Sequence, residues 1–516
     1  MFELHHLSAQ DIWDWIRRGD TSPLAVTDHY LERIARLDPG LQAFVRVTAD
    51  DARDRAAHLA ERVPTSRVLW GLPSADKDLY DRAGVPTRSG SRSTPDTPAT
   101  ADHPLVRALD DAGAISLGKT ATPEFGLSST TESLLEGPTR NPWDTRLSPG
   151  GSSGGAAAAV AAGLVPVAVG SDGGGSVRIP AAATGLVGLK PSRGRVPSMP
   201  GRAGLGGLVV AGPIARSVAD AGLVLDALVA PTGVPDRSSF ALTTPSDGTG
   251  PFLAAATRGE GRFTIGVLDG SPWDDVVDVR THPAAADAVA ETLSHLEALG
   301  HGVEDVAMPR AEYARWFRVA WQASAARLPD VPGLDLTELE PLTAWLVDRG
   351  RALSGVQVLE AMAGLDAFSA ALIRALDAYD AVLTPTLAMP PRPIGWYSED
   401  PEENFADQCR YSPWTSMCNV SGLPAITLPV SVTGPGAGAG SRSGAGAGAG
   451  SGSGPGADAG SGAGAGSGSG SGSGDGAGLP MGVQLIGRPG GERTLLALGA
   501  QLERRVHWQR RHPPGW

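Results

Sequence analysis

Apolar residues along the chain follow two kinds of pattern, and their alternation indicates an α/β fold. Near the N-terminus a hydroxyl cap is followed by proline, and apolar positions then recur at helical spacing (Thr21-Ser22-Pro23, then Leu24, Val26, Tyr30, Ile34 and Leu37). We therefore expect residues 1–65 to be helical. Later apolar runs are typical of strands: Ala114–Leu117, Val165–Val169, Gly185–Leu189, Phe263–Leu268, Ala381–Thr384, Ala425–Pro429 and Met481–Ile486. Helical patterns lie between them, at 102–112, 282–299, most of 310–378 and 491–505, and this alternation predicts a sheet covered by helices.

Residues 434–478 break the pattern, because they are almost entirely Gly, Ala and Ser without amphipathic periodicity. Such a tract cannot bury enough apolar surface to offset the entropy of ordering it, so we expect a disordered insertion. The apolar segments that flank it look like consecutive parts of one domain. We therefore predict a single domain over 1–516, made of N-terminal helices (1–65), a motif-bearing region (66–230) and a remainder (231–433 and 479–516) interrupted by the 434–478 tract.

Composition narrows the classes of function. The chain has 516 residues and a net charge of −13, which disfavours binding to nucleic acid. Its two cysteines, Cys409 and Cys418, make no disulfide framework, and no Cys/His group has zinc-ligand spacing, so we expect no metal and no cofactor. The N-terminus lacks a secretory pattern, and no uninterrupted apolar run is long enough to predict a membrane span. These features predict a cytoplasmic enzyme without a membrane partner, and leave a homodimer possible.

The candidate chemistry lies in three motifs that supply one lysine and two serines. Lys77 follows Ser74-Ala75-Asp76, Ser152 and Ser153 lie in a glycine-rich run at 150–155, and Ser176 follows Gly173-Gly174-Gly175. A serine hydroxyl needs a base to become nucleophilic, and a neutral lysine amine can be that base. Consecutive glycines let several backbone N–H groups converge on one point, as an oxyanion hole requires. Asp172 and Arg178 flank the glycine turn, and we interpret them as a structural ion pair.

The orientation of Lys77 is critical for this chemistry, because a carboxylate beside the amine would keep it protonated. If residues around 77 form a strand, the Lys77 side chain points to one face, and those of Asp76 and Asp78 point to the other.

Together the motifs resemble the amidase signature family of serine hydrolases. The resemblance extends over most of the chain outside 434–478 and includes several further segments: Gly118–Thr120, Thr122–Phe125, Asn141–Asp144, Gly188–Pro191, Thr384–Thr386 and Gly422–Ala425. It implies a large mixed sheet sandwiched by helices. It also implies that Ser176 is the nucleophile, Ser152 a bridging serine after a cis peptide, Lys77 the base and Gly173 through Ser176 the oxyanion hole, with Ser153, Asp172 and Arg178 in support. The substrate would be a small-molecule amide.

Two details concern what is particular to this chain. Family members commonly carry an apolar residue where this chain has Asp76, so a buried Asp76 beside Lys77 would disturb the base. The segments 130–133 and 137–143 are similar to the branch that includes 6-aminohexanoate cyclic-dimer hydrolases. We expect specificity to lie in 310–415, where we interpret Trp316, Trp321 and Trp414 as core residues.

Four other interpretations stay open at this stage. Residues 150–154 also fit G-x-S-x-G, which would make Ser152 a nucleophile served by His282, His295 or His301. Residues 113–120 fit the P-loop pattern, although their middle is strand-like. The chain could be a glutaminase-type subunit of a tRNA-dependent amidotransferase, but 310–350 lacks that group's motifs. A binding module without catalysis is disfavoured, because all three catalytic positions are filled.

Overall fold

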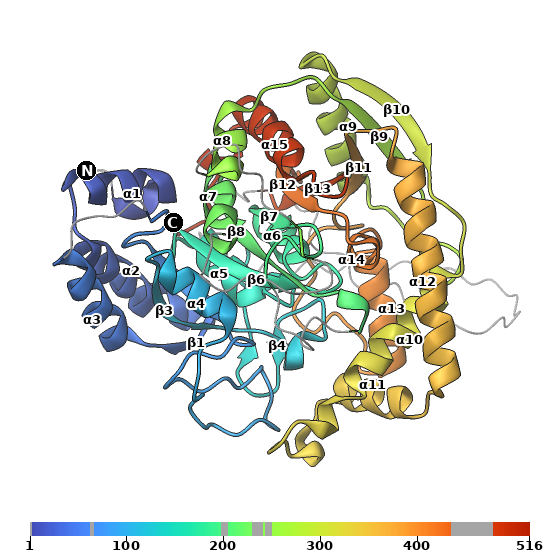
Figure 1. Cartoon of the computed structure of the whole chain (residues 1–516), viewed down its shortest axis with the longest axis horizontal. Helices are drawn as coiled ribbons and strands as arrows, with labels where there is room; N and C mark the ends of the chain where they lie inside the picture. The colour runs from blue at the N-terminus through green and yellow to red at the C-terminus, as the bar shows by residue number, and fades with distance from the viewer. Residues whose placement is uncertain (1–2, 62–66, 198–204, 230–240, 243–249, 435–477) are drawn as a thin grey trace, which may run out of the picture.

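A mixed sheet of eight strands runs through the centre of the molecule (Figure 1). The computed structural model describes residues 3–61, 67–197, 205–229, 241–242, 250–434 and 478–516. The strand order is β10-β9-β11-β13-β12-β7-β8-β6, in which β9 pairs in parallel with β10 and β11 and all other neighbours are antiparallel. The strands are β6 (Val167–Asp172), β7 (Val187–Lys190), β8 (Val210–Ala215), β9 (Thr264–Asp269), β10 (Gly302–Ala307), β11 (Ala381–Pro385), β12 (Ala425–Val432) and β13 (Pro480–Gly487).

Two smaller sheets accompany it. One has the order β1-β3-β2, and the other is a short antiparallel pair. Their strands are β1 (Phe44–Val47), β2 (Pro73–Lys77), β3 (Ile115–Thr120), β4 (Glu132–Ser133) and β5 (Gly137–Pro138). Strand β2 packs against β6, so the small sheet joins the large one where Lys77 lies.

Helices cover both faces of the large sheet, which confirms the predicted α/β sandwich. Gly482 and Gly487 of β13 point to opposite faces, because they are an odd number of positions apart. A Cβ on Gly482 would lie 2.8 Å from Ala182 of α6 (Arg178–Thr184), whereas one on Gly487 would lie 3.1 Å from Leu495 of α15 (Glu492–Val506). The other helices are α1 (Ala9–Arg18), α2 (Pro23–Leu37), α3 (Ala49–Ala60), α4 (Pro104–Asp111), α5 (Gly154–Ala161), α7 (Val218–Val229), α8 (Pro251–Arg258), α9 (Pro283–Ala298), α10 (Tyr313–Ala325), α11 (Pro341–Arg351), α12 (Gly355–Leu376), α13 (Pro401–Tyr411) and α14 (Ser416–Ser421).

The seven predicted strands and the predicted helices are present, with ends displaced by a few residues. The prediction that residues 1–65 are entirely helical was wrong, because Phe44–Val47 forms β1 against β3. This strand is four residues long, and only Phe44 is buried in it, so it is too short to show a strand periodicity. The cap predicted at Ser22 is confirmed, since its hydroxyl accepts the N–H of Ala25 at 3.1 Å.

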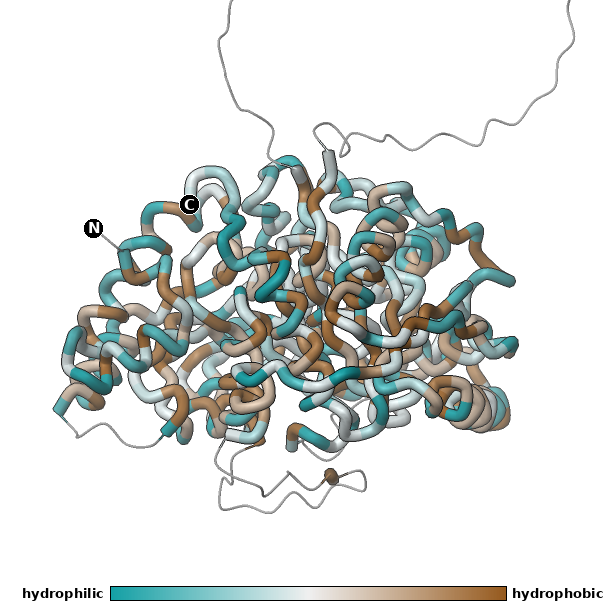
Figure 2. Tube along the Cα trace, turned by 90° about the horizontal axis from the view of Figure 1, so that it is seen from above, coloured by the Kyte–Doolittle hydropathy of each residue, from teal (hydrophilic) through white to brown (hydrophobic). Residues whose placement is uncertain are grey.

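Apolar side chains of the described residues gather in two large clusters and a small one around Ile179 and Tyr411. One large cluster joins α5, α7 and α15 to the N-terminal helices, and the other joins α10, α12, α13 and α14. Figure 2 shows hydrophobic segments threading the interior between hydrophilic outer ones. Within the described residues, α12 alone is long and apolar enough to cross a membrane by length and composition, a criterion that core helices also meet.

Both ends of the chain lie on the same side of the molecule (Figures 1 and 2). The rings of His6 and Trp516 are stacked with their centroids 6.4 Å apart, and His512 stacks on Trp516 at 4.4 Å. The C-terminal residue is therefore packed against the first helical segment.

The Gly/Ala/Ser tract connects two paired strands. Residues 435–477 lie outside the described residues, so their predicted disorder stays a prediction. Strand β12 pairs with β13 up to Val432 and Pro480, and the N–H of Thr433 donates to Leu479 O at 2.8 Å. The tract thus leaves and rejoins the fold at adjacent points, as a loop expansion would.

Replacing 435–477 with a two-residue Asn-Gly turn should preserve the fold. Because a shorter loop costs less closure entropy, the free energy of unfolding should stay unchanged or rise by up to about 2 kcal/mol. Urea unfolding followed by circular dichroism measures it, with a scrambled tract of the original length as control. Insoluble protein, or a clear loss of stability relative to that control, would show that the tract contributes to the fold.

Candidate active site

The Lys77 amine is held by three serine hydroxyls. Lys77 ends β2 and is fully buried, and its Nζ lies 2.7 Å from Ser152 Oγ, 2.9 Å from Ser153 Oγ and 2.9 Å from Ser171 Oγ. Ser171 comes from β6, and the other two serines precede α5. Lys77, Ser152 and Ser153 were predicted from the sequence, whereas Ser171 was not. The only signal in the sequence for a role of Ser171 was its position in a strand, directly before Asp172.

The predicted separation of Lys77 from its neighbouring carboxylates is confirmed. Asp76 is buried, but its carboxylate accepts Arg82 Nε at 2.6 Å and Ser116 Oγ at 2.8 Å. The Asp78 carboxylate lies 3.6 Å from Lys119 Nζ. Both carboxylates therefore have basic partners other than Lys77. Asp76 therefore does not pair with the Lys77 amine.

This environment favours a neutral lysine. Burial lowers the pKa of Lys77 from 10.5 to about 7, and the more distant Asp172 carboxylate partly opposes the shift. A neutral amine has two N–H bonds and one lone pair. Ser153 donates its own proton to Ser171 O at 3.3 Å, so its oxygen is oriented to accept from Lys77. If Ser171 accepts the second N–H, the lone pair is left for the shortest contact, to Ser152.

Close backbone packing shapes the Ser152 loop. The Gly151–Ser152 peptide is cis, as the family resemblance implied. A Cβ on Gly151 would lie 2.1 Å from the carbonyl oxygen of Thr130, so only glycine fits there. Thr131 fixes the same loop, because its hydroxyl donates to Gly150 O at 2.9 Å and accepts Gly154 N–H at 3.2 Å.

A buried ion pair anchors the Ser176 turn. Arg178 donates to both oxygens of Asp172, at 2.9 and 2.8 Å, and neither side chain is exposed. Arg178 also donates to Gln484 Oε1 and Asn419 Oδ1, at 2.6 and 2.7 Å. Burial alone would raise the pKa of Asp172, but Arg178 holds it at about 2. The pair therefore links β6 and α6 to α14 and β13. This agrees with its interpretation as a structural ion pair.

The glycine turn offers fewer free donors than the sequence suggested. Gly175 N–H donates to Asp172 Oδ1 at 2.8 Å, so this group is already used inside the turn. Across the described part of the chain, no hydrogen bond engages the N–H groups of Gly173, Gly174 or Ser176. The oxyanion hole over Gly173, Gly174 and Gly175 stays a prediction, in which the Gly175 N–H would be shared with Asp172.

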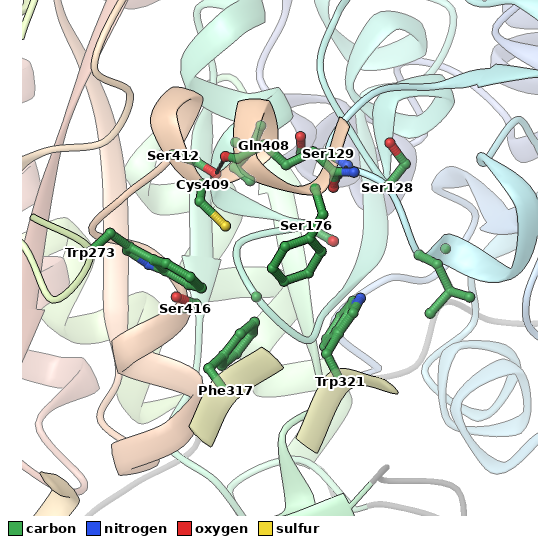
Figure 3. A pocket seen from close by; sticks show the side chains of 15 residues that line it. Ser128, Ser129, Ser176, Trp273, Phe317, Trp321, Gln408, Cys409, Ser412 and Ser416 are labelled. Carbon is green, nitrogen blue, oxygen red and sulfur yellow. Dashed lines mark hydrogen bonds between the residues drawn. The ribbon is translucent and has the colours of Figure 1, made fainter. Parts of the chain in front are cut away.

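Two cavities meet at Ser176. The first, of about 60 Å³, is lined by four aromatic side chains, Trp273, Phe317, Trp321 and Phe405, and by polar residues that include Gln408 and Ser416 (Figure 3). The second, of about 220 Å³, contains Ser152, Ser171 and Gly173, and Trp321 borders both cavities. Much of the first wall comes from 310–415, where specificity was expected. Trp321 was wrongly interpreted as a core residue, whereas Trp414 is buried with its Nε1 donating to Gly270 O at 3.0 Å.

The structure disfavours two of the alternative motifs. His282 caps α9, His301 bonds Gln501 and Phe263, and His295 contacts Arg505, so none of these histidines serves Ser152. Residues 115–120 form strand β3, and Lys119 is buried against Tyr80 O and Thr87 rather than in a phosphate loop. Among the residues with described positions, no group of His, Cys, Asp or Glu could hold a metal, and both cysteines are buried thiols.

Comparison with known proteins agrees with this geometry. A family model described as Amidase matches residues 25–496. The chain belongs to the amidase family. It is 37% identical over 503 residues to the putative amidase AmiB2 of Mycobacterium tuberculosis, covering 96% of this chain and 94% of that protein. It is also 31% identical to a glutamyl-tRNA(Gln) amidotransferase subunit of Azotobacter vinelandii, covering 99% of this chain and all of that subunit.

The amidase fold is also found among solved structures. A structure of 6-aminohexanoate cyclic dimer hydrolase complexed with substrate superposes with a TM-score of 0.81 and 26% identity, covering 99% of both chains. The expected amidase signature fold and the expected class, an amide-hydrolysing enzyme, are thus confirmed.

Removing the charge of Arg178 should destabilise this amidase. Arg178→Met leaves Asp172 buried without its partner, so the free energy of unfolding should fall by about 3–5 kcal/mol. Chemical denaturation measures it, and Arg280→Met in the exposed Arg280–Asp278 pair is the matched control, expected to be neutral. Adding Asp172→Asn should recover part of the loss. Wild-type stability in Arg178→Met would contradict a structural role for the pair.

Loss of the Ser171 hydroxyl should change the pH profile. If Lys77 is the predicted base, it acts when neutral, so kcat/KM should rise as pH increases through about 7 and level off above it. Ser171→Ala removes an acceptor that stabilises the ammonium, so the rise should move to lower pH by about 0.7 units and the plateau should fall about tenfold. Ser369→Ala on α12 is the control for a serine deletion. An unshifted profile in Ser171→Ala would exclude this positioning role.

Proposed function

We propose that this amidase hydrolyses a small carboxamide through an acyl-enzyme on Ser176, with Ser152 as the bridging serine and Lys77 as the base. The observation that carries the proposal is the Lys77 amine, which is fully buried, lies 2.7 Å from Ser152 Oγ and forms no ion pair with a carboxylate of the described residues. A buried ammonium without a counter-ion is unfavourable, so the amine is available as a proton acceptor near neutral pH.

The proton path follows the hydroxyls. Ser176 Oγ attacks the carbonyl carbon while its proton passes to Ser152 Oγ, and the Ser152 proton passes to Lys77 Nζ. The tetrahedral intermediate then collapses, the carbon–nitrogen bond breaks, and the leaving nitrogen takes a proton from Ser152 that Lys77 replaces. Water then attacks the acyl ester by the same path, which releases the carboxylate and restores Ser176.

Two features support the transfer between the serines. Ser153 N–H donates to Ser176 O at 3.2 Å, which ties the two loops together, and Ser152 and Ser176 line the same cavity. Within the described residues no hydrogen bond joins their hydroxyls, a geometry that catalytic groups often adopt before substrate binds. The N–H groups of Gly173, Gly174 and Ser176 would stabilise the oxyanion.

A glutaminase-type subunit is the second candidate, and the similarity to an amidotransferase subunit favours it. The pocket chemistry speaks against it. Glutamine carries an ammonium and a carboxylate, which need charged or strongly polar partners once they leave water. Among the described residues that line the two cavities, none is Asp, Glu, Lys or Arg. A neutral amide therefore fits better, and we propose a cytoplasmic amidase that acts without a partner subunit.

Labelling with a fluorophosphonate and mapping the modified peptide tests the nucleophile. The adduct should lie on Ser176, and Ser176→Ala should lose both the adduct and all measurable amide turnover. An adduct on Ser152 instead, or substantial turnover by Ser176→Ala, would sink the assignment. Ammonia release from glutamine, measured in parallel, should stay at background. Efficient release that required a co-purifying protein would favour the glutaminase.

A further inference from the structure

The two cavities beside Ser176 differ in which catalytic groups they contain. The larger one, which we call the amine cavity, contains Ser152, Ser171 and Gly173. The smaller aromatic one, the acyl pocket, contains Gly174 and no group of the Lys77 cluster. Ser176 and Trp321 line both, so a carbonyl attacked by Ser176 lies at their junction.

Proton transfer decides which half of the substrate enters which cavity. The leaving nitrogen needs a proton as the carbon–nitrogen bond breaks, and Ser152 is the hydroxyl linked to Lys77 at 2.7 Å. The nitrogen must therefore face the cavity that contains Ser152. The acyl substituent diverges from the nitrogen at the same carbon, so it points into the other one.

The sizes of the cavities then limit the substrate. A cavity of about 150 Å³ is enough to take up benzene. The amine cavity, at about 220 Å³, exceeds this volume, whereas the acyl pocket, at about 60 Å³, has room for only a few carbon atoms.

The lining of the amine cavity favours an apolar amine. Apart from Ser152, Ser171 and Ser176, the polar members of its wall are Tyr80, His103 and Ser324. The apolar side chains that line it are Leu79, Phe125, Leu127, Leu208, Val209 and Trp321. Among the lining residues with described positions there is no Asp or Glu that would pair with a cationic substituent. Burial of a charged group there would be costly.

We propose that the preferred substrate is a secondary amide that joins a short acyl group to an apolar, ring-sized amine, rather than a primary amide. This assignment rests on the proposed function, since it uses Ser152 as the proton donor. With such a substrate the released product is an apolar amine, and the acyl group that stays on Ser176 is small.

Two isomeric substrates test the assignment. N-benzylacetamide places the ring on the amine, whereas the N-methyl amide of phenylacetic acid contains the same atoms with the ring on the acyl side. Burial of a ring in only one of the two orientations predicts at least about a tenfold higher kcat/KM for N-benzylacetamide. A preference for the other isomer, equal rates, or turnover of neither by enzyme that labels on Ser176 would overturn it.

A variant locates the preference in the amine cavity. Ser324 lies on α10, and its hydroxyl donates only within that helix, to Ala320 O at 2.9 Å. Ser324→Phe should fill the cavity and lower kcat/KM for N-benzylacetamide at least about tenfold, while N-methylacetamide changes less than about threefold. An equal loss for both substrates would contradict the assignment. Fluorophosphonate labelling of Ser176 separates the two proposals. If the wild-type enzyme were not labelled on Ser176, the proposal that Ser176 is the nucleophile would itself be refuted.

Discussion

The site depends on burying one lysine amine without giving it a counter-ion. The two charged residues next to Lys77 in the sequence have other partners, Asp76 in Arg82 and Asp78 in Lys119. What remains around the amine is a set of hydroxyls, which accept hydrogen bonds without fixing a charge. A chain that neutralised Lys77 with a carboxylate would gain an ion pair and lose its base. The fold therefore has to keep the carboxylates of Asp76 and Asp78 away from the Lys77 amine, and it does so.

The buried pair of Asp172 and Arg178 contrasts with Lys77, because both of its members are charged. Asp172 and Arg178 are kept ionised and fully paired, and they link β6, α6, α14 and β13 around the Ser176 turn. Segments more than 200 positions apart in the chain are joined there, at Arg178 and Gln484. The same interior therefore holds lysines whose pKa is lowered by burial, Lys77 and Lys190, and an arginine that is charged. Arginine suits the second task because its pKa stays far above neutrality.

Much of this arrangement could be predicted from local patterns. The glycine runs and their serines, the strand before Lys77 and the alternation of strands and helices are all visible in the sequence, since each depends on residues close together in the chain. Strand β1 was missed because a four-residue strand with one buried side chain has no periodicity. Ser171, Asn419 and Gln484 were missed because their partners are distant in sequence. Trp321 was misassigned because a pocket wall and a core have the same apolar pattern.

Because the chain ends lie close together, the elements of this fold could be connected in a different order along the chain. Trp516 stacks on His6, so the two termini are neighbours, while the Gly/Ala/Ser tract joins strand ends that are already paired at Val432 and Pro480. A short linker could therefore join the present ends, and new ends could open within the tract. Strand β13, which supplies Gln484 to Arg178, would then begin the polypeptide instead of nearly finishing it. The order in which the ribosome makes the parts of this site is thus separable from the structure they form.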